Sequence, residues 1–191
     1  MKIVIGLVGE IGGGKGTFFT LLKEESPQYS IARIGFSDVI RETLTLWGLP
    51  NTRENLQKLP QAMDQFYGSG SLTHAIKKRA ESKIEDIVVL DGVRWETDFE
   101  MIKSFPKNIL VYVTAQPEVR FQRLRVRPQN TGDFNLEWAT FLQQEQAPNE
   151  TSIAHIGSRA DYKIENNSTI EAYRNQVKDF CRKFLEPKLA T

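Results

Sequence analysis

The sequence has a single cysteine, no long apolar run and almost no net charge. Because Cys181 stands alone, an internal disulfide framework is excluded and a reducing compartment is indicated. No stretch approaches the roughly 18 apolar residues of a membrane-spanning helix, and the apolar run from Ile3 to Val8 is too short for a signal-peptide core. A formal net charge of +1 over 191 residues gives no reason to expect nucleic acid or a membrane surface as a partner. We therefore expect a soluble, cytoplasmic protein.

A glycine-rich stretch follows the first apolar run, with the sequence Gly9-Glu10-Ile11-Gly12-Gly13-Gly14-Lys15-Gly16-Thr17. The residues after it, from Phe18 to Lys23, are typical of a helix. A strand, a glycine-rich turn and a helix in this order indicate a phosphate-binding loop. Glycines allow the backbone N–H groups from Gly12 to Thr17 to surround an anion, and the start of the helix adds its positive dipole end. Lys15 supplies a charge that can reach the β- and γ-phosphates of a nucleoside triphosphate.

The rest of the chain alternates strands with helices. Further strands are expected at residues 31–36, 87–90, 109–113 and 161–164. Continuous apolar runs such as 87–90 are typical of strands buried on both faces of a parallel sheet. The pattern predicts one α/β domain over residues 1–191, a doubly wound parallel sheet of five strands with its ligands at the carboxyl ends. Two segments exceed what a simple crossover needs: a helical insertion at about 37–83, and a polar lid bracketed by prolines at about 128–150.

Charged residues follow two of these strands, where sites in this architecture lie. Asp38 and Arg41 lie in the first turn of a helix for which Ser37 is the expected N-cap, and they are close enough to interact. Asp91 and Arg94 come directly after the most apolar strand, and Gly92 between them permits close approach of the backbone. A solvated ion pair at 38 and 41, and helix capping by Asp91, are the structural alternatives.

Four arginines follow the fourth strand: Arg120, Arg123, Arg125 and Arg127. Arg123 and Arg127 are four residues apart and share a helix face, and their planar guanidinium groups suit the oxygens of a transferring phosphoryl group. We expect Arg120 and Arg125 to lie on a solvated basic face. From residue 128 to residue 158 there is no further arginine or lysine, so only Arg159 remains to return a charge from the lid.

Nearly the whole chain resembles the P-loop nucleoside monophosphate kinases, and its motifs follow one another in the same order as in those kinases. The loop pattern Gly-x-x-Gly-x-Gly-Lys-Gly-Thr is similar to that of adenylate kinase, although the hydroxyl comes one residue late, at Thr17. Residues 37–41 resemble the acceptor-binding helix of those kinases, and residues 91–94 resemble their Asp-Gly-x-x-Arg turn, shortened by one residue. Residues 160–168 resemble the last strand and loop of dephospho-coenzyme A kinases. The resemblance is strongest to an adenylate-kinase-related, dephospho-coenzyme-A-kinase-like group common in archaea, and it implies the strand order 2-3-1-4-5.

This resemblance implies ATP-dependent transfer of a phosphoryl group, assisted by Mg²⁺, to a small phosphate-bearing acceptor, foremost a nucleoside monophosphate. The residues expected in catalysis are Lys15, Asp38, Asp91, Arg123 and Arg127. Those expected to bind ATP are Gly12, Gly13, Gly14, Lys15, Gly16 and Thr17, and those expected to bind the acceptor are Asp38, Arg41, Gly92 and Arg94. Thr17, Asp38 and Asp91 are expected to hold Mg²⁺, mostly through water. Because an acceptor phosphate is already anionic, no general base is required.

Two alternatives stay open. A dephospho-coenzyme A kinase would phosphorylate a hydroxyl group with Asp38 as its base, but residues 91–94 replace the different motif of such enzymes. A nucleotide-binding switch or assembly factor that hydrolyses ATP slowly would be consistent with the sparse arginines of the lid.

Overall fold

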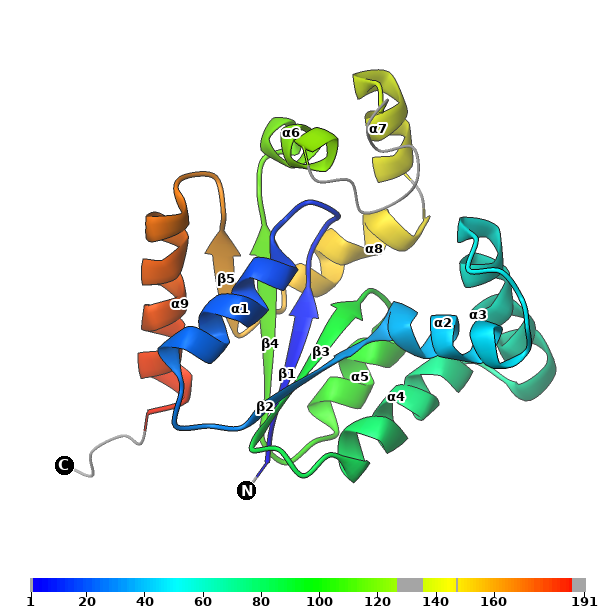
Figure 1. The fold of residues 1–191 in the computed structure, drawn as a ribbon, viewed down its shortest axis with the longest axis horizontal. Coiled ribbons are helices and arrows are strands. Elements are labelled where there is room, and N and C mark those ends of the chain that lie inside the picture. The colour runs from blue at the N-terminus through cyan, green and yellow to red at the C-terminus, as the bar shows by residue number, and fades with distance from the viewer. Residues whose placement is uncertain (1, 127–135, 147, 187–191) are drawn as a thin grey trace.

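A computed structural model of the chain describes residues 2–126, 136–146 and 148–186. Its centre is a sheet of five parallel strands in the order β2-β3-β1-β4-β5 (Figure 1). The strands are β1 (Ile3–Val8), β2 (Ile31–Gly35), β3 (Ile87–Val93), β4 (Asn108–Thr114) and β5 (Tyr162–Glu165). The predicted fold class and strand order are confirmed.

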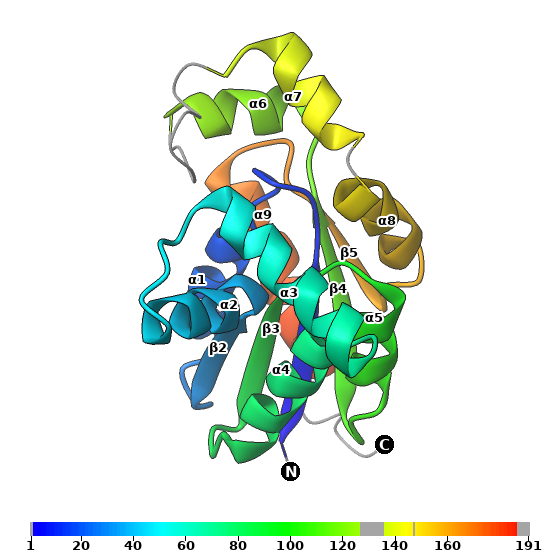
Figure 2. The same ribbon diagram turned by 90° about the vertical axis from the view of Figure 1, so that its right-hand side faces the viewer.

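The helices of the described chain lie on both faces of this sheet and over its carboxyl ends. They are α1 (Lys15–Glu25), α2 (Phe36–Leu46), α3 (Arg53–Tyr67), α4 (Ser71–Ser82), α5 (Glu96–Lys103), α6 (Pro117–Val126), α7 (Trp138–Glu145), α8 (Pro148–Gly157) and α9 (Ile170–Phe184). Helices α1 and α9 pack together on one face, and α4, α5 and α8 cover the other. Figure 2 shows α6 and α7 side by side above the strand ends. In the described residues, no helix has the length and apolar character needed to cross a membrane.

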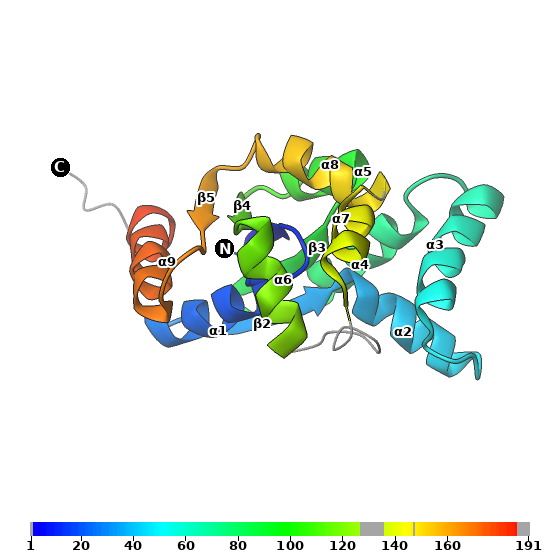
Figure 3. The same cartoon turned by 90° about the horizontal axis from the view of Figure 1, so that it is seen from above.

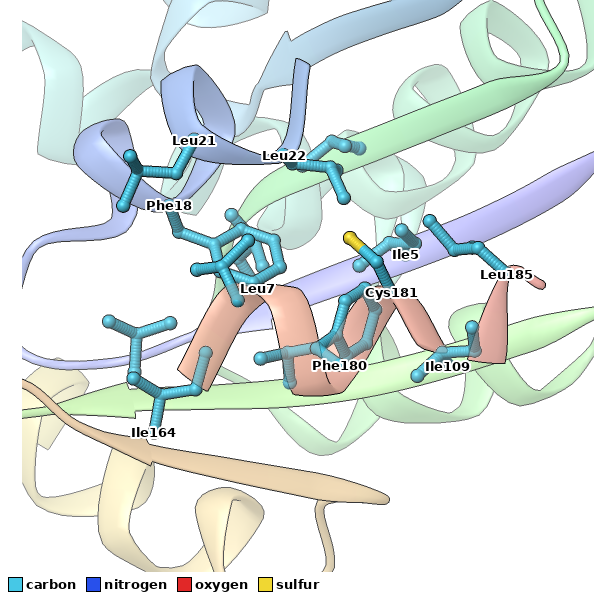
Figure 4. Close-up of a cluster of buried hydrophobic side chains, with 14 of the residues drawn as sticks. Ile5, Leu7, Phe18, Leu21, Leu22, Ile109, Ile164, Phe180, Cys181 and Leu185 are labelled. Atoms are coloured by element: carbon cyan, nitrogen blue, oxygen red, sulfur yellow. The ribbon is translucent and has the colours of Figure 1, made fainter. Parts of the chain in front are cut away.

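Alternating strand residues divide the core between the two faces. Val89 packs on the side of α1 and α9, whereas Val88 and Leu90 pack on the side of α4 and α5. Figure 4 shows the first cluster, in which Phe18 of α1 meets Phe180 of α9 edge to face, with ring centroids 5.4 Å apart. Fully burying an aliphatic or aromatic side chain of this kind stabilises the fold by about 1.5–3 kcal/mol. The strand that bears the glycine-rich loop, β1, contributes Ile5 and Leu7 to one cluster and Val4 and Val8 to the other, so it is packed on both faces.

Cys181 belongs to the same cluster. Its side chain is buried, and its sulfur accepts a hydrogen bond from the Ser26 hydroxyl at 3.2 Å. Burial raises the pKa of the thiol, so it is a packing group.

The predicted helical insertion consists of α2, α3 and α4, which pack on one another; α4 lies against the sheet, and α3 lies farthest from it (Figure 3). The expected N-cap at Ser37 is wrong: α2 already begins at Phe36, and Gly35 is the capping position. The Asp38 carboxylate accepts a hydrogen bond from the Gly35 N–H at 3.1 Å, so a side chain inside the helix satisfies the capping donor.

The predicted lid lies partly outside the described residues, which omit 127–135 and 147. Its described part contains helix α7, which packs on α6. Although this segment is polar in composition, Phe141 is fully buried against Phe121 and Leu124. This small aromatic cluster packs α7 against α6 above the strand ends.

Candidate functional site

The glycine-rich loop between β1 and α1 has a backbone that other residues would not tolerate. Gly12 and Gly14 have φ angles of 77° and 109°, in the region that favours glycine. A Cβ atom at Gly14 would lie 2.4 Å from Asn166 Nδ2, so the approach is also too close for a side chain. Asn166 Nδ2 in turn donates to the Gly13 carbonyl, and the Tyr173 hydroxyl donates to the Gly14 carbonyl, both at 3.0 Å. Residues near the C-terminus therefore fix the loop from outside.

The loop presents its amides at the start of α1. The first N–H groups of a helix have no acceptor within it, so Lys15, Gly16 and Thr17 contribute free donors toward an anion. Gly13 differs from the prediction, because its N–H donates to the Glu10 carbonyl at 3.1 Å and closes the turn.

The Lys15 side chain folds over this loop. Its Nζ atom donates to the carbonyl oxygens of Gly9 at 2.6 Å and Glu10 at 3.0 Å. Burial lowers the pKa of Lys15, and the nearby Asp91 carboxylate opposes that shift. Phosphate oxygens would supply the negative charge that this buried ammonium group lacks.

A cleft of about 920 Å³ opens beside the loop. It is lined by Gly12, Gly14, Lys15, Gly16, Thr17, Thr20, Arg33, Asp91, Gln122, Arg123, Leu124 and Val126. Its charged side chains come from four elements: α1, β2, β3 and α6. Three are cationic and one is acidic, so the cleft favours an anionic ligand.

Asp91 and Arg123, two of the predicted catalytic residues, both line the cleft, and their catalytic role stays a prediction. Asp91 is only 8% exposed. Arg123 donates to the backbone oxygen of Asn166 at 2.9 Å and to its side-chain oxygen at 3.2 Å, and so lies over the residue that fixes the loop. Arg127, its predicted partner, lies outside the described residues.

Arg33 is a cleft residue that the sequence reading missed. Its Nε and Nη2 atoms both donate to Asp91 Oδ2, at 3.0 and 2.7 Å. Its position in β2 is what places Arg33 near Asp91. Gly35 pairs with Asp91, and residues two apart in a strand share a face, so Arg33 lies on the same face of the sheet as Asp91. This position becomes a usable signal only once β2 and β3 are known to be neighbours.

The predicted acceptor residues are not among those that line the cleft. Asp38 caps α2, and Arg41 makes no hydrogen bond or ion pair with the described part of the chain. Gly92 has a φ angle of 113°, which explains why glycine occupies that position. The Arg94 guanidinium forms an ion pair with Glu150 of α8. Their role toward an acceptor stays a prediction.

Two arginines differ from what was expected. Arg120, assigned to a solvated face, is 4% exposed; its Nε donates to the Ala115 carbonyl at 2.9 Å and its Nη2 pairs with Glu145 at 2.5 Å. It therefore ties α6 to α7. Arg159, the one cation expected to return from the lid, pairs with Glu96 and stacks on Phe99, 3.9 Å from the ring centroid. Arg125 is exposed, as expected.

Asp98 positions the segment that carries Arg94. Its Oδ2 atom accepts hydrogen bonds from the N–H groups of Arg94 and Trp95, both at 3.0 Å, and its Oδ1 atom accepts one from the Thr73 hydroxyl at 2.7 Å. The side chain is almost fully buried, and burial raises its pKa. It is therefore Asp98, and not Asp91, that caps α5.

Asp98→Ala is expected to destabilise the protein by about 2–3 kcal/mol, because two partly buried backbone donors lose their acceptor. Chemical denaturation would measure this loss. Glu100→Ala, an exposed position on the same helix, is the control. A loss within about 0.5 kcal/mol for Asp98→Ala, the scale of surface substitutions, would contradict the capping role.

The lowered pKa of Lys15 predicts that the affinity for nucleotide depends on pH. Its pKa is lowered chiefly by burial and further by Arg94, while Asp91, Glu150 and Glu10 act in the opposite direction. Bound phosphates would raise this pKa, so at a pH between the lowered value and the ordinary 10.5 the protein should take up a proton when nucleotide binds. The affinity for nucleotide should then fall as the pH rises through the lowered pKa of Lys15 in the unliganded protein. Calorimetry in buffers of different ionisation enthalpy measures the uptake. Lys15→Arg should abolish it, and equal uptake in that variant would exclude Lys15 as the source.

The residues present suit Mg²⁺. Thr17 and Asp91 line the same cleft and carry oxygen donors, the ligands that Mg²⁺ prefers. No cluster of three or more histidine, cysteine or acidic side chains within residues 2–126, 136–146 and 148–186 could hold a metal by itself. The ion would therefore depend on phosphate oxygens and water, with these two side chains in support.

The strand order, the loop with its lysine and the cleft beside it define a P-loop kinase-like, nucleotide-binding fold. The chain belongs to the family whose model is described as an AAA domain, which matches residues 8–138, and to the UPF0200 proteins. It is 30% identical over 188 residues to the UPF0200 protein of Pyrococcus horikoshii, covering 96% of this chain and 98% of the relative. The UPF0200 protein of Sulfurisphaera tokodaii is 29% identical over 185 residues, covering 95% of this chain and 97% of the relative.

Solved structures show the same fold. The shikimate kinase of Bacteroides thetaiotaomicron has a TM-score of 0.62 at 15% identity, covering 95% of this chain and 97% of its own. The shikimate kinase of Acinetobacter baumannii, in complex with shikimate, has a TM-score of 0.57 at 18% identity, covering 100% of this chain and 97% of its own. A gluconokinase from Sinorhizobium meliloti has a TM-score of 0.56 at 14% identity, covering 95% of this chain and 92% of its own. At these identities the likeness establishes the fold alone.

Proposed function

We propose that the protein transfers the γ-phosphoryl group of ATP to a small acceptor that itself carries a phosphate, a nucleoside monophosphate in the first place. The observation that carries the proposal is the cleft beside the loop, which is lined by three cationic side chains, Lys15, Arg33 and Arg123, together with the carboxylate of Asp91. Such an arrangement suits phosphoryl transfer, in which positioning and charge neutralisation provide most of the catalysis.

The donor and the acceptor would occupy opposite sides of Lys15. The amides at the start of α1 would bind the donor phosphates, and Lys15 would contact the β- and γ-phosphates. Arg123 would neutralise the transferring group from α6. Mg²⁺, when bound, would draw charge from the phosphate oxygens. Arg41 and Arg94 would bind the acceptor phosphate, since they follow the neighbouring strands β2 and β3.

A screen of nucleoside monophosphates with labelled ATP tests this proposal. Dephospho-coenzyme A, shikimate and gluconate belong in the same screen as hydroxyl acceptors. Transfer to a monophosphate at a rate well above ATP hydrolysis supports the proposal. Transfer only to a hydroxyl acceptor would refute the acceptor class and retain the kinase.

A second function is favoured by two ion pairs. The Arg94 guanidinium is bound by Glu150, and the Arg159 guanidinium by Glu96, so two cations expected near the acceptor or the lid have carboxylate partners within the protein. A nucleotide-dependent switch would need no acceptor clamp. It would consume ATP at the same low rate with and without monophosphates, and would respond to a protein or RNA partner instead.

The lid proposed at residues 128–150 should close over the bound ligands. Amides of α7 are expected to exchange more slowly when a bisubstrate analogue is bound, because closure excludes water. Hydrogen exchange followed by mass spectrometry measures this. Amides of β1, buried in the sheet, are the internal reference. Equal exchange of α7 with and without the analogue would argue against a lid.

A further inference from the structure

Arg33 is the charged residue of the cleft that was not predicted from the sequence and that has no role of its own in the proposed transfer. It extends from β2, one of the two edge strands of the sheet, and its side chain is 43% exposed. In the register of β2 and β3, Gly35 lies beside Asp91, and Arg33 is two residues earlier on the same face. The guanidinium therefore runs along β3 toward the carboxyl end of that strand, where Asp91 lies.

The contact between Arg33 and Asp91 uses only one of the two carboxylate oxygens of Asp91. Nε and Nη2 of Arg33 both donate to Oδ2, at 3.0 and 2.7 Å. The other oxygen, Oδ1, takes part in no hydrogen bond with the described residues, although Asp91 is 92% removed from solvent and lines the cleft. Two bonds to one oxygen fix the rotation of a carboxylate and leave its second oxygen available.

We propose that Arg33 is a positioning residue: by holding Oδ2 of Asp91, it keeps Oδ1 directed at the water shell of the Mg²⁺ ion that accompanies ATP. Side chains that support metal ions through water are usually fixed by hydrogen bonds of their own, and loss of such partners typically costs 10–100-fold in metal affinity. The inference rests on the proposed function, because it needs ATP with Mg²⁺ as the donor.

Two other roles for Arg33 make different predictions. If it contacts the donor phosphates directly, its loss weakens ATP binding with and without metal. If it only neutralises a buried carboxylate, its loss lowers stability and leaves the effect of Mg²⁺ on binding unchanged. The decisive quantity is therefore the gain in ATP affinity that Mg²⁺ provides.

Calorimetric titration of ATP, once with Mg²⁺ and once with EDTA, measures this gain without any turnover. Arg33→Met keeps the aliphatic stem and removes the guanidinium. We expect the gain in ATP affinity from Mg²⁺ to fall about tenfold or more, the lower end of the range for such partners, beyond the smaller loss that removal of a positive charge from the cleft causes without metal. Arg79→Met is the matched control, because Arg79 pairs with Glu42 on the helical insertion and its side chain is 36% exposed. An equal loss with and without Mg²⁺, or no loss, would overturn the inference.

Arg33→Met also leaves the Asp91 carboxylate buried without its partner, which destabilises a fold strongly when a charge is uncompensated. The double variant Arg33→Met/Asp91→Asn removes that charge. If Arg33 acts through Asp91, the double variant should show the same gain from Mg²⁺ as Asp91→Asn alone. Additive losses would overturn the positioning role.

The wild-type titration separates this inference from the proposed function. A wild-type protein that binds ATP no better with Mg²⁺ would overturn the proposed donor and the role of Arg33 together. A wild-type gain that persists in Arg33→Met would overturn the role of Arg33 alone.

Discussion

Replacement of Lys15 by alanine is expected to reduce phosphoryl transfer by at least about a hundredfold, the scale of removing one preorganised donor from a transition state. The fold should persist, because the glycines, Asn166 and Tyr173 still fix the loop when the two hydrogen bonds from Lys15 to the Gly9 and Glu10 carbonyls are lost. Stability should change little, since the loss of these bonds is offset by removal of a charged group whose pKa burial lowers. Steady-state turnover and a thermal melt of the same preparation measure both effects.

The matched control is Lys23→Ala, an exposed lysine near the other end of α1. It removes the same charge from the same helix and should change neither turnover nor ATP affinity. Near-normal turnover of Lys15→Ala would exclude the loop as the site of the donor phosphates. A loss shared by both lysine variants would show that the effect is one of net charge.

Replacement of Arg94 by alanine is expected to weaken acceptor binding by about ten- to a hundredfold, the equivalent of a hydrogen bond to a charged group, while ATP affinity barely changes. The reason is placement: Arg94 follows β3, Arg41 lies in the first turns of the helix after β2, and β2 and β3 are neighbours. Titration of ATP and of a panel of monophosphates against the variant measures the two affinities separately.

The ion pair with Glu150 complicates this variant, because Arg94→Ala leaves a largely buried carboxylate without its cation. The double variant Arg94→Ala/Glu150→Gln removes that cost, and the selective loss of acceptor affinity should persist in it. Arg159→Ala, which breaks the pair with Glu96, is the control for loss of an arginine nearby. Equal losses for donor and acceptor in both Arg94 variants would eliminate the acceptor clamp.

The sequence by itself determined the phosphate-binding loop. A buried strand, the glycine positions, Lys15 and the helix that follows are contiguous, so local residues were enough to locate the loop. The hydrogen bond that closes the turn at Gly13, and the support from Asn166 and Tyr173, appeared only in the structure. The five strands could be located from local residues as well, because buried parallel strands are continuous apolar runs. Their order came from a family resemblance, since pattern alone does not say which strands are neighbours.

Only the tertiary structure decided the partners of the charged groups. Arg33 meets Asp91 across 58 residues of sequence, Arg94 meets Glu150 across 56, and Arg120 meets Glu145 across 25. No local pattern assigns such pairs, and a helix face that looks solvated can be covered by a distant segment, as α7 covers Arg120. The chemistry of a side chain follows from its type, but whether it faces water, a carboxylate or a ligand depends on which distant segments the fold brings against it.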